Sequence, residues 1–144
     1  LILADEPTTA LDVSVSNSIL ELLSELKNLG KTIILITHDL SIVSNYCDRA
    51  NIMYLGNIVE SSASDKLFKT PMHPYTNALL KALPDKKGVK LQNIKGQISP
   101  ITEIIQGCKF HPRCEKAIEI CKTVIPKQIN VNETCVMCHL YDKN

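Results

Sequence analysis

The sequence contains no tryptophan, and aromatic residues make up only 4% of its 144 residues. No stretch reaches the roughly 18–20 consecutive apolar residues that a membrane-spanning helix requires. Neither sign of charge dominates, because the formal net charge is +1, whereas binding to nucleic acid or to an acidic lipid surface usually leaves a basic excess. These absences argue against a membrane-spanning segment and against nucleic acid as a partner.

The chain begins at Leu1 and not at a methionine, and no signal peptide is visible. We therefore expect it to be a fragment of a longer protein. Its length suffices for one modest domain with a core of its own, and its 44% apolar and 22% charged residues are ordinary for a globular protein.

The first part of the sequence predicts an α/β fold. Leu1–Ala4 and Thr32–Thr37 are continuous apolar runs, typical of parallel strands buried on both faces. Between them, Asp12 is a plausible N-cap for a helix that begins at Val13 and ends before Gly30. Strand, helix and strand in this order predict a βαβ unit with a right-handed crossover.

Further elements follow along the chain. A short helix is expected over 40–47, and "RANIMYLGNIVES" predicts two strands joined by a turn at Gly56-Asn57. "DKLFKT" and "YTNALLKAL" are candidate helices, separated by an extended turn at "PMHP". We divide the chain into residues 1–66, a helical extension at 67–84, a linker at 85–107 and a loop-rich, cysteine-containing segment at 108–144.

Polar side chains follow both predicted parallel strands. Asp5 and Glu6 end the first, and His38 and Asp39 end the second. Because ligands of parallel α/β sheets bind beyond the carboxyl ends of the strands, these groups are candidates for one site. An Asp in that place helps to hold Mg²⁺ on a nucleotide, and an adjacent carboxylate can activate water. Alternatively, the two acids only cap a strand and the histidine is structural.

The two stretches resemble an ABC-transporter ATPase. "LILADEPTTALD" resembles its Walker B strand and D-loop, and "TIILITHD" its switch-histidine strand. The resemblance implies the partial parallel sheet of a P-loop NTPase, with ATP and Mg²⁺ as cofactors. It also implies that Asp5 holds Mg²⁺ through water, Glu6 is the general base, His38 senses the γ-phosphate and Asp12 meets a partner subunit.

Two elements of a complete ATPase of this kind are absent from the sequence. "LGKT" at 29–32 resembles the end of a phosphate-binding loop, but Glu25 stands where the pattern needs glycine, and the run leads from helix to strand. The serine-glycine signature loop is also missing. We expect the 144-residue chain alone neither to bind ATP tightly nor to hydrolyse it.

"PMHPYTNALLKALP" narrows the resemblance. By composition it is a proline-bracketed surface helix. It also resembles the extension found on the ATPases of dipeptide, oligopeptide and nickel importers, through six residues: His73, Pro74, Tyr75, Thr76, Leu79 and Leu80.

Cysteines are unevenly distributed. Cys47 stands alone and is expected to be a small buried residue, whereas five crowd into the last segment: Cys108, Cys114, Cys121, Cys135 and Cys138. Without an export signal, metal binding is favoured over disulfides. Wide, uneven spacing favours an iron–sulfur cluster over zinc, although zinc or free or oxidised thiols stay open.

This segment also resembles the C-terminal segment of the peptide-importer ATPases. The resemblance implies a [4Fe–4S] cluster held by Cys108, Cys114, Cys121 and Cys138. Cys135 is then surplus or a substitute for Cys138, and Glu115 stands where the family usually has proline. His111 and His139 are expected to be solvated loop residues and not ligands.

The resemblance covers essentially the whole chain and implies part of the ATP-hydrolysing subunit of an ABC importer for peptides or nickel. Such a subunit lies peripherally on the cytoplasmic face of the membrane. It pairs with a second ATPase subunit and two permease subunits, and indirectly serves an extracytoplasmic solute-binding protein. The alternatives are a soluble ABC ATPase without a transport role and a metal-binding regulatory module without ATPase activity.

Overall fold

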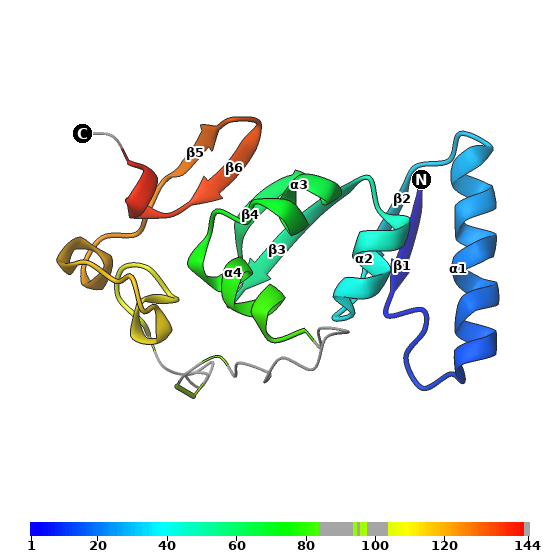
Figure 1. The fold of residues 1–144 in the computed structure, drawn as a ribbon, viewed down its shortest axis with the longest axis horizontal. Coiled ribbons are helices and arrows are strands. Elements are labelled where there is room, and N and C mark those ends of the chain that lie inside the picture. Colours follow the sequence, from blue (N-terminus) through cyan, green and yellow to red (C-terminus); the bar gives the residue numbers. More distant parts are fainter. Residues whose placement is uncertain (84–93, 95, 98–103, 143–144) are drawn as a thin grey trace. The chain divides into compact units, whose positions relative to one another are not determined.

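The computed structural model describes residues 1–83, 94, 96–97 and 104–142, and they form two compact units, Leu1–Cys47 and Asp48–Asn144 (Figure 1). Both units combine helices with small sheets, as an α/β fold requires. Among the described residues, no helix has both the length and the apolar character needed to cross a bilayer. The predicted linker at 85–107 falls mostly outside these residues and stays a prediction.

The first unit is the predicted strand–helix–strand arrangement. Strands β1 (Ile2–Asp5) and β2 (Ile33–Ile36) pair in parallel, with Ile2 opposite Ile33 and Asp5 opposite Ile36. Helix α1 (Val13–Asn28) connects them, and α2 (Leu40–Tyr46) follows β2. The parallel register brings the carboxyl ends of both strands to one edge, which positions the candidate site.

Both ends of α1 have the predicted caps. The Asp12 carboxylate accepts a hydrogen bond of 2.9 Å from the Val15 N–H, which satisfies a backbone donor that the first turn leaves unpaired. At the other end, Gly30 adopts a φ of +80°, and the Lys31 N–H bonds to the Leu26 carbonyl at 3.1 Å. These contacts form a Schellman ending, in which glycine supplies the left-handed residue at low cost.

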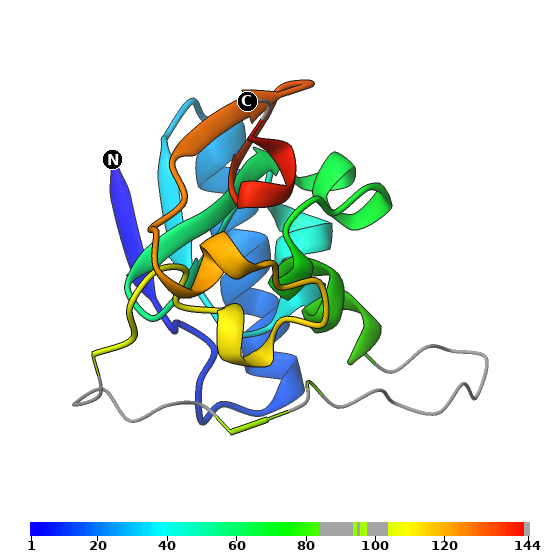
Figure 2. The same ribbon diagram turned by 90° about the vertical axis from the view of Figure 1, so that its left-hand side faces the viewer.

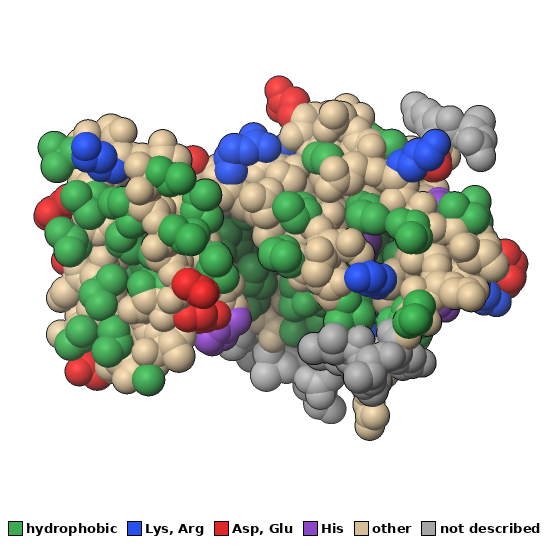
Figure 3. Space-filling model, turned by 180° about the vertical axis from the view of Figure 1, so that it is seen from behind, with side chains coloured by type: hydrophobic (Ala, Val, Ile, Leu, Met, Phe, Trp, Pro, Cys, Tyr) green, Lys and Arg blue, Asp and Glu red, His purple; other side chains and the backbone are tan. Residues whose placement is uncertain are grey.

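The prediction that β1 and β2 are buried on both faces is wrong for the described residues. Burial alternates along both strands, and Leu3 is 66% exposed, with Ile34 and Ile36 exposed beside it. Apolar side chains accordingly cover much of the surface of this unit in the view from behind (Figure 3). Only one face of the two-stranded sheet is covered within this part of the chain.

The second unit is built on a four-stranded antiparallel sheet in the order β3-β4-β6-β5. Its strands are β3 (Arg49–Tyr54), β4 (Asn57–Ala63), β5 (Gln128–Val131) and β6 (Thr134–Met137). The helices are α3 (Ser64–Lys69) and α4 (Pro74–Lys81), with three short 3₁₀ helices, η1 (His111–Arg113), η2 (Glu119–Lys122) and η3 (His139–Tyr141). The turns η1 and η2, in yellow and orange, face the viewer in Figure 2.

Residues from both ends of this unit form its core. The buried apolar side chains come from β3, β4, α3 and β6 and from the cysteine-containing loop: Ala50, Ile52, Tyr54, Val59, Leu67, Phe110, Cys121, Val136 and Cys138. The aromatic rings of Tyr54 and Phe110 meet edge to face at 5.2 Å, and Tyr75 packs against both. The cysteine segment is therefore packed into the unit and contributes two strands to its sheet.

The turn between β3 and β4 lies one residue earlier than predicted. Tyr54 pairs with Asn57, so the two-residue loop is Leu55-Gly56, with φ values of +43° and +79°. Positive φ at both positions is typical of a type I′ hairpin, which matches the twist of the flanking strands. Asn132 and Glu133 form a similar turn between β5 and β6, with φ values of +47° and +61°. This second hairpin was not predicted.

Gly107 and Gly56 give a matched test of backbone constraint. A Cβ at Gly107 would lie 2.3 Å from the Cys121 carbonyl oxygen, whereas a Cβ at Gly56 meets open space, and both residues have positive φ. We expect Gly107→Ala to lower the free energy of unfolding by about 3 kcal/mol or more and Gly56→Ala by about 1 kcal/mol, measured by urea denaturation. Equal losses in the two variants would contradict the close contact at Gly107.

Candidate functional site

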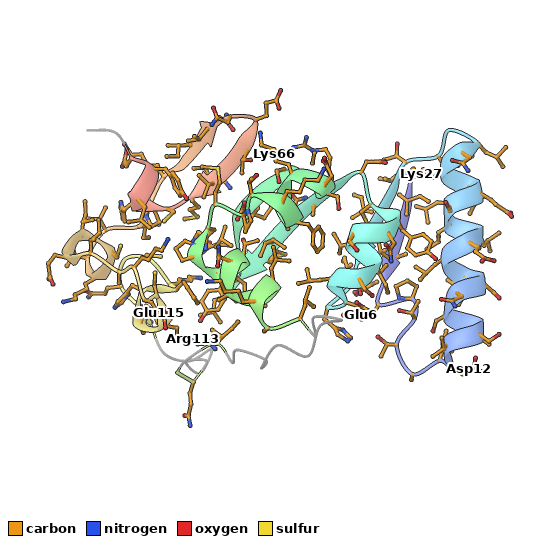
Figure 4. All side chains as sticks on the ribbon, viewed as in Figure 1. Glu6, Asp12, Lys27, Lys66, Arg113 and Glu115 are labelled. Atoms are coloured by element: carbon orange, nitrogen blue, oxygen red, sulfur yellow. The ribbon has the colours of Figure 1, made fainter. Side chains whose placement is uncertain are left out.

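The candidate site lies where β1 and β2 end. Glu6 directly follows β1, and its N–H bonds to the Ile36 carbonyl at 2.9 Å, so the chain leaves the sheet next to the last residue of β2. Its φ of +46° is a left-handed conformation that is uncommon for a non-glycine residue. Figure 4 shows Glu6 at this edge and Asp12 at the beginning of α1.

Glu6 and His38 are in direct contact. His38 Nδ1 lies 2.8 Å from Glu6 Oε1, and the Thr9 hydroxyl donates to Glu6 Oε2 at 2.8 Å. Both carboxylate oxygens are therefore engaged, which orients the group. The site is open to solvent, since the His38 side chain is 80% exposed and that of Glu6 is 35% exposed.

The contact shifts the pKa of both groups. Hydrogen bonds from His38 and then from Thr9 lower the pKa of Glu6 below 4.5. The hydrogen bond to Glu6, followed by its negative charge, raises the pKa of His38 above 6.5. Each group thus favours the charged form of the other. A histidine whose pKa is raised by an adjacent carboxylate favours the protonated form, which is suited to binding an anion and to donating a proton.

The other predicted residues of this site have different surroundings. Asp5 is exposed at the end of β1, opposite Ile36. Asp39 caps α2 by accepting a 2.8 Å hydrogen bond from the Ser41 N–H, which lowers the pKa of its carboxyl. Beside His38, a groove of about 510 Å³ is lined by the loop before α1, by the first part of α1 and by α2, including Thr9, Leu20 and Ile42. The edge therefore offers room for a ligand next to the Glu6–His38 pair.

Four of the five clustered cysteines lie near one another. Burial, followed by repulsion from Cys108, Cys114 and Cys121, raises the pKa of Cys138 to about 11. Burial is also the main cause of the raised pKa of Cys108 and Cys114, and here too the neighbouring thiols contribute. No disulfide joins any of the six cysteines, all of which lie in the described part of the chain. Within the described ranges, no three His, Cys, Asp or Glu side chains are placed to hold a metal ion.

Cys135 is set apart from the other four. It lies on β6 at a half-buried position, while Val136 and Thr134 on either side of it are buried. Because side chains alternate along a strand, Cys135 points to the other face from Val136 and Cys138. The alternation separates Cys135 from Cys138, and the role of Cys108, Cys114, Cys121 and Cys138 as ligands stays a prediction.

Backbone contacts hold the cysteine loop in place. The Cys108 N–H bonds to the Cys121 carbonyl at 2.8 Å, and the Cys114 N–H to the His111 carbonyl at 3.2 Å. His111 Nδ1 lies 2.9 Å from the Cys108 carbonyl, and His139 Nε2 lies 2.9 Å from the Val124 carbonyl. His139 is buried, so the expectation that it is a solvated loop residue is wrong.

Two further residues were not found by sequence reasoning. Thr9 fixes the second oxygen of Glu6, and its position three residues after a carboxylate in a turn was the available signal. The other is Glu60, which is fully buried on β4.

The interpretation of residues 71–84 as a surface helix is wrong for His73 and Thr76, because both are buried. His73 contacts Glu60 and Phe110, which are distant in sequence, and composition does not reveal such contacts.

Comparisons with known proteins agree with these observations. Residues 59–121 match the family described as "Oligopeptide/dipeptide transporter, C-terminal region". The chain is 43% identical over 147 residues to the oligopeptide transport ATP-binding protein AppD of Bacillus subtilis, covering 99% of this chain and 45% of that protein. Dipeptide transport ATP-binding proteins DppD of Caldanaerobacter subterraneus and Haemophilus influenzae are 40% and 42% identical, covering 99% and 96% of this chain. The chain spans less than half the length of these relatives.

The contact between Glu6 and His38 predicts how stability depends on pH and how the pKa of His38 responds to substitution. The pair stabilises the fold most between the two pKa values. The contribution of Glu6 to stability is present above pH 4.5 and is lost as the pH falls through its lowered pKa. The contribution of His38 to stability is present below pH 6.5 and is lost as the pH rises through its raised pKa. We expect the pKa of His38, measured by NMR titration, to fall towards 6.5 in Glu6→Gln. It should not change in Asp5→Asn, and equal effects of the two variants would contradict the specific contact.

Proposed function

Because the chain belongs to the family of oligopeptide and dipeptide transport ATP-binding proteins, we propose that it is part of the ATP-hydrolysing subunit that powers peptide import through an ABC transporter. The observation that carries the proposal is the 2.8 Å contact between Glu6 and His38 at the carboxyl ends of two parallel strands. This is where α/β sheets bind their ligands.

The proposed mechanism gives each residue of this edge a role. Glu6 is the general base that takes a proton from the attacking water, and its lowered pKa keeps it ionised at neutral pH. His38 orients Glu6 and, when protonated, attracts the γ-phosphate of the nucleotide. Asp5 would hold Mg²⁺ through a water molecule. Bound Mg²⁺–ATP supplies the phosphoanhydride bond that is cleaved.

The names of the relatives support a proposal for partners and location. Asp12, at the exposed beginning of α1, would meet a second ATPase subunit across the nucleotide. Two permease subunits would hold the pair at the cytoplasmic face of the membrane, with an extracytoplasmic solute-binding protein delivering the solute. The names of the relatives favour peptides over nickel. The match at 59–121 favours this function over a soluble, non-transport ABC ATPase or a regulatory metal-binding module.

The cysteine group is the proposed site of a [4Fe–4S] cluster. Cys108, Cys114, Cys121 and Cys138 would hold it, and Cys135 would not. Four soft thiolate donors from one loop-rich segment suit such a cluster, which would act as a structural staple. Among the described residues, no group of three His, Cys, Asp or Glu side chains is placed to hold a metal ion. The proposal therefore rests on the four thiols and on their wide, uneven spacing in the sequence.

The catalytic proposal is tested in a complete ATPase subunit that carries these residues. We expect Glu6→Gln to lower kcat about 10²- to 10⁴-fold while ATP binding is retained, measured by phosphate release and nucleotide titration. The control is Glu21→Gln, an exposed acid on α1, which should leave kcat unchanged. The isolated 144-residue chain should release no phosphate above buffer. A fall in kcat of less than tenfold in Glu6→Gln would refute its assignment as the base.

The cluster proposal is tested by anaerobic reconstitution of the chain with iron and sulfide. Iron and acid-labile sulfide should each reach about four per chain in the unmodified protein and in Cys135→Ser. Cys114→Ser, the matched variant from the proposed ligand set, should lose most of both. Stoichiometric zinc uptake with no sulfide incorporation would instead favour the zinc alternative.

A further inference from the structure

A buried carboxylate on β4 holds the segment that precedes α4. Glu60 is fully buried, and its two oxygens accept hydrogen bonds of 2.8 Å each from the backbone N–H groups of Met72 and His73. These two charge-assisted bonds offset the cost of removing the carboxylate from water. The path of the backbone at residues 72–73 is therefore fixed to the centre of the sheet.

The His73 ring connects this segment to the strand before Cys138. The ring is 1% exposed. Its Nδ1 accepts a 3.0 Å hydrogen bond from the Tyr75 N–H and so caps α4. The ring proton must then lie on Nε2, which is the atom available to donate to the backbone carbonyl of Met137. Burial lowers the pKa of His73 to about 4, so the ring keeps this neutral, two-bond arrangement at neutral pH.

A second hydrogen bond joins residues 72–73 to the chain that follows Cys138. The Tyr141 hydroxyl donates to the Met72 carbonyl at 2.8 Å. Cys138 lies between Met137, whose backbone carbonyl is the partner of the His73 ring, and Tyr141, whose side-chain hydroxyl bonds to Met72. The loop that carries Cys108 also packs against this segment, since the ring centroids of His73 and Phe110 lie 5.9 Å apart.

We propose that His73 is a positioning residue for Cys138: its ring holds the Met137 carbonyl and thereby fixes the thiol towards the other three clustered cysteines. This inference gives the motif around His73 a role in the cysteine site, 65 residues further along the chain. It deepens the proposed function, because the purpose of the fixed thiol rests on the proposed cluster. The contact itself does not require a cluster and can be tested without one.

Two substitutions separate the two bonds of the ring. His73→Asn keeps a short side-chain acceptor for the Tyr75 N–H, because asparagine is a good N-cap, but it is too short to reach Met137. His73→Gln carries an amide donor at about the reach of Nε2 and should keep the bond to Met137. Tyr141→Phe removes only the hydroxyl that bonds to Met72. It serves as a second, milder variant if His73→Asn fails to fold.

The first measurement is the alkylation rate of each thiol in the metal-free chain, followed by mass spectrometry of peptides with iodoacetamide as the probe. We expect His73→Asn to raise the rate at Cys138 about five- to tenfold, as the loss of one buried hydrogen bond implies. Tyr141→Phe should raise it less, and His73→Gln should restore a rate within about twofold of the unmodified protein. Cys135 is the internal control, because it points to the opposite face of β6.

An unchanged rate at Cys138 in both His73→Asn and Tyr141→Phe would overturn the proposal. So would an equal increase at Cys135 and Cys138, which indicates general loosening of the hairpin. The second measurement is the rate at which a chelator removes iron from the reconstituted chain, expected to be faster in His73→Asn than in His73→Gln. If the unmodified chain takes up no iron, the proposed cluster fails, while the alkylation rates still decide the role of His73.

Discussion

The second unit depends on the buried carboxylate of Glu60. This residue lies at the middle of the four-stranded sheet, opposite Ile52 on β3 and opposite Val136 on β6, and both of these neighbours are buried apolar residues. An acid in such surroundings is costly unless its oxygens are satisfied. The two N–H groups of residues 72–73 satisfy it, so the chain after α3 must turn back onto the sheet before α4 begins. The place where α4 begins follows from this requirement, because His73 is the N-cap of that helix.

The first unit obeys a simpler constraint. Two parallel strands that end at the same edge bring together residues that are distant in sequence, and Glu6 and His38 meet for this reason. The left-handed backbone at Glu6 turns its carboxylate back towards the sheet edge, and Thr9 holds it there. Strain of this kind is commonly stored at functional sites. The contact is local to the unit, because both residues lie within Leu1–Cys47.

Sequence patterns predicted the first unit well and the second unit less well. Asp12, Gly30 and the two apolar runs carry strong local signals for caps and strands, and these elements form as predicted. The β5–β6 hairpin was missed because its strands are four residues each and one of them contains a cysteine that suggested metal chemistry instead. The burial of His73 depends on Glu60 and Met137, which no local pattern connects to it. The exposed face of β1 and β2 has the composition of a covered strand, and exposure depends on what packs against a strand.

The pairing of β4 with β6 has a consequence for the order of folding. In the described part of the chain two residue pairs join these strands, Glu60 with Val136 and Ser61 with Cys135, and the strands are separated in sequence by the seventy residues 64–133. Bringing together two strands so far apart in sequence costs conformational entropy, and the two β4–β6 residue pairs offset this cost only in part. The β3–β4 hairpin can form early from local contacts, whereas the sheet of four strands closes late, after β6 has been synthesised. Until then Glu60 and the apolar surface around it are open to water. On the ribosome, this interval is the time in which the unit is most exposed to misfolding and proteolysis.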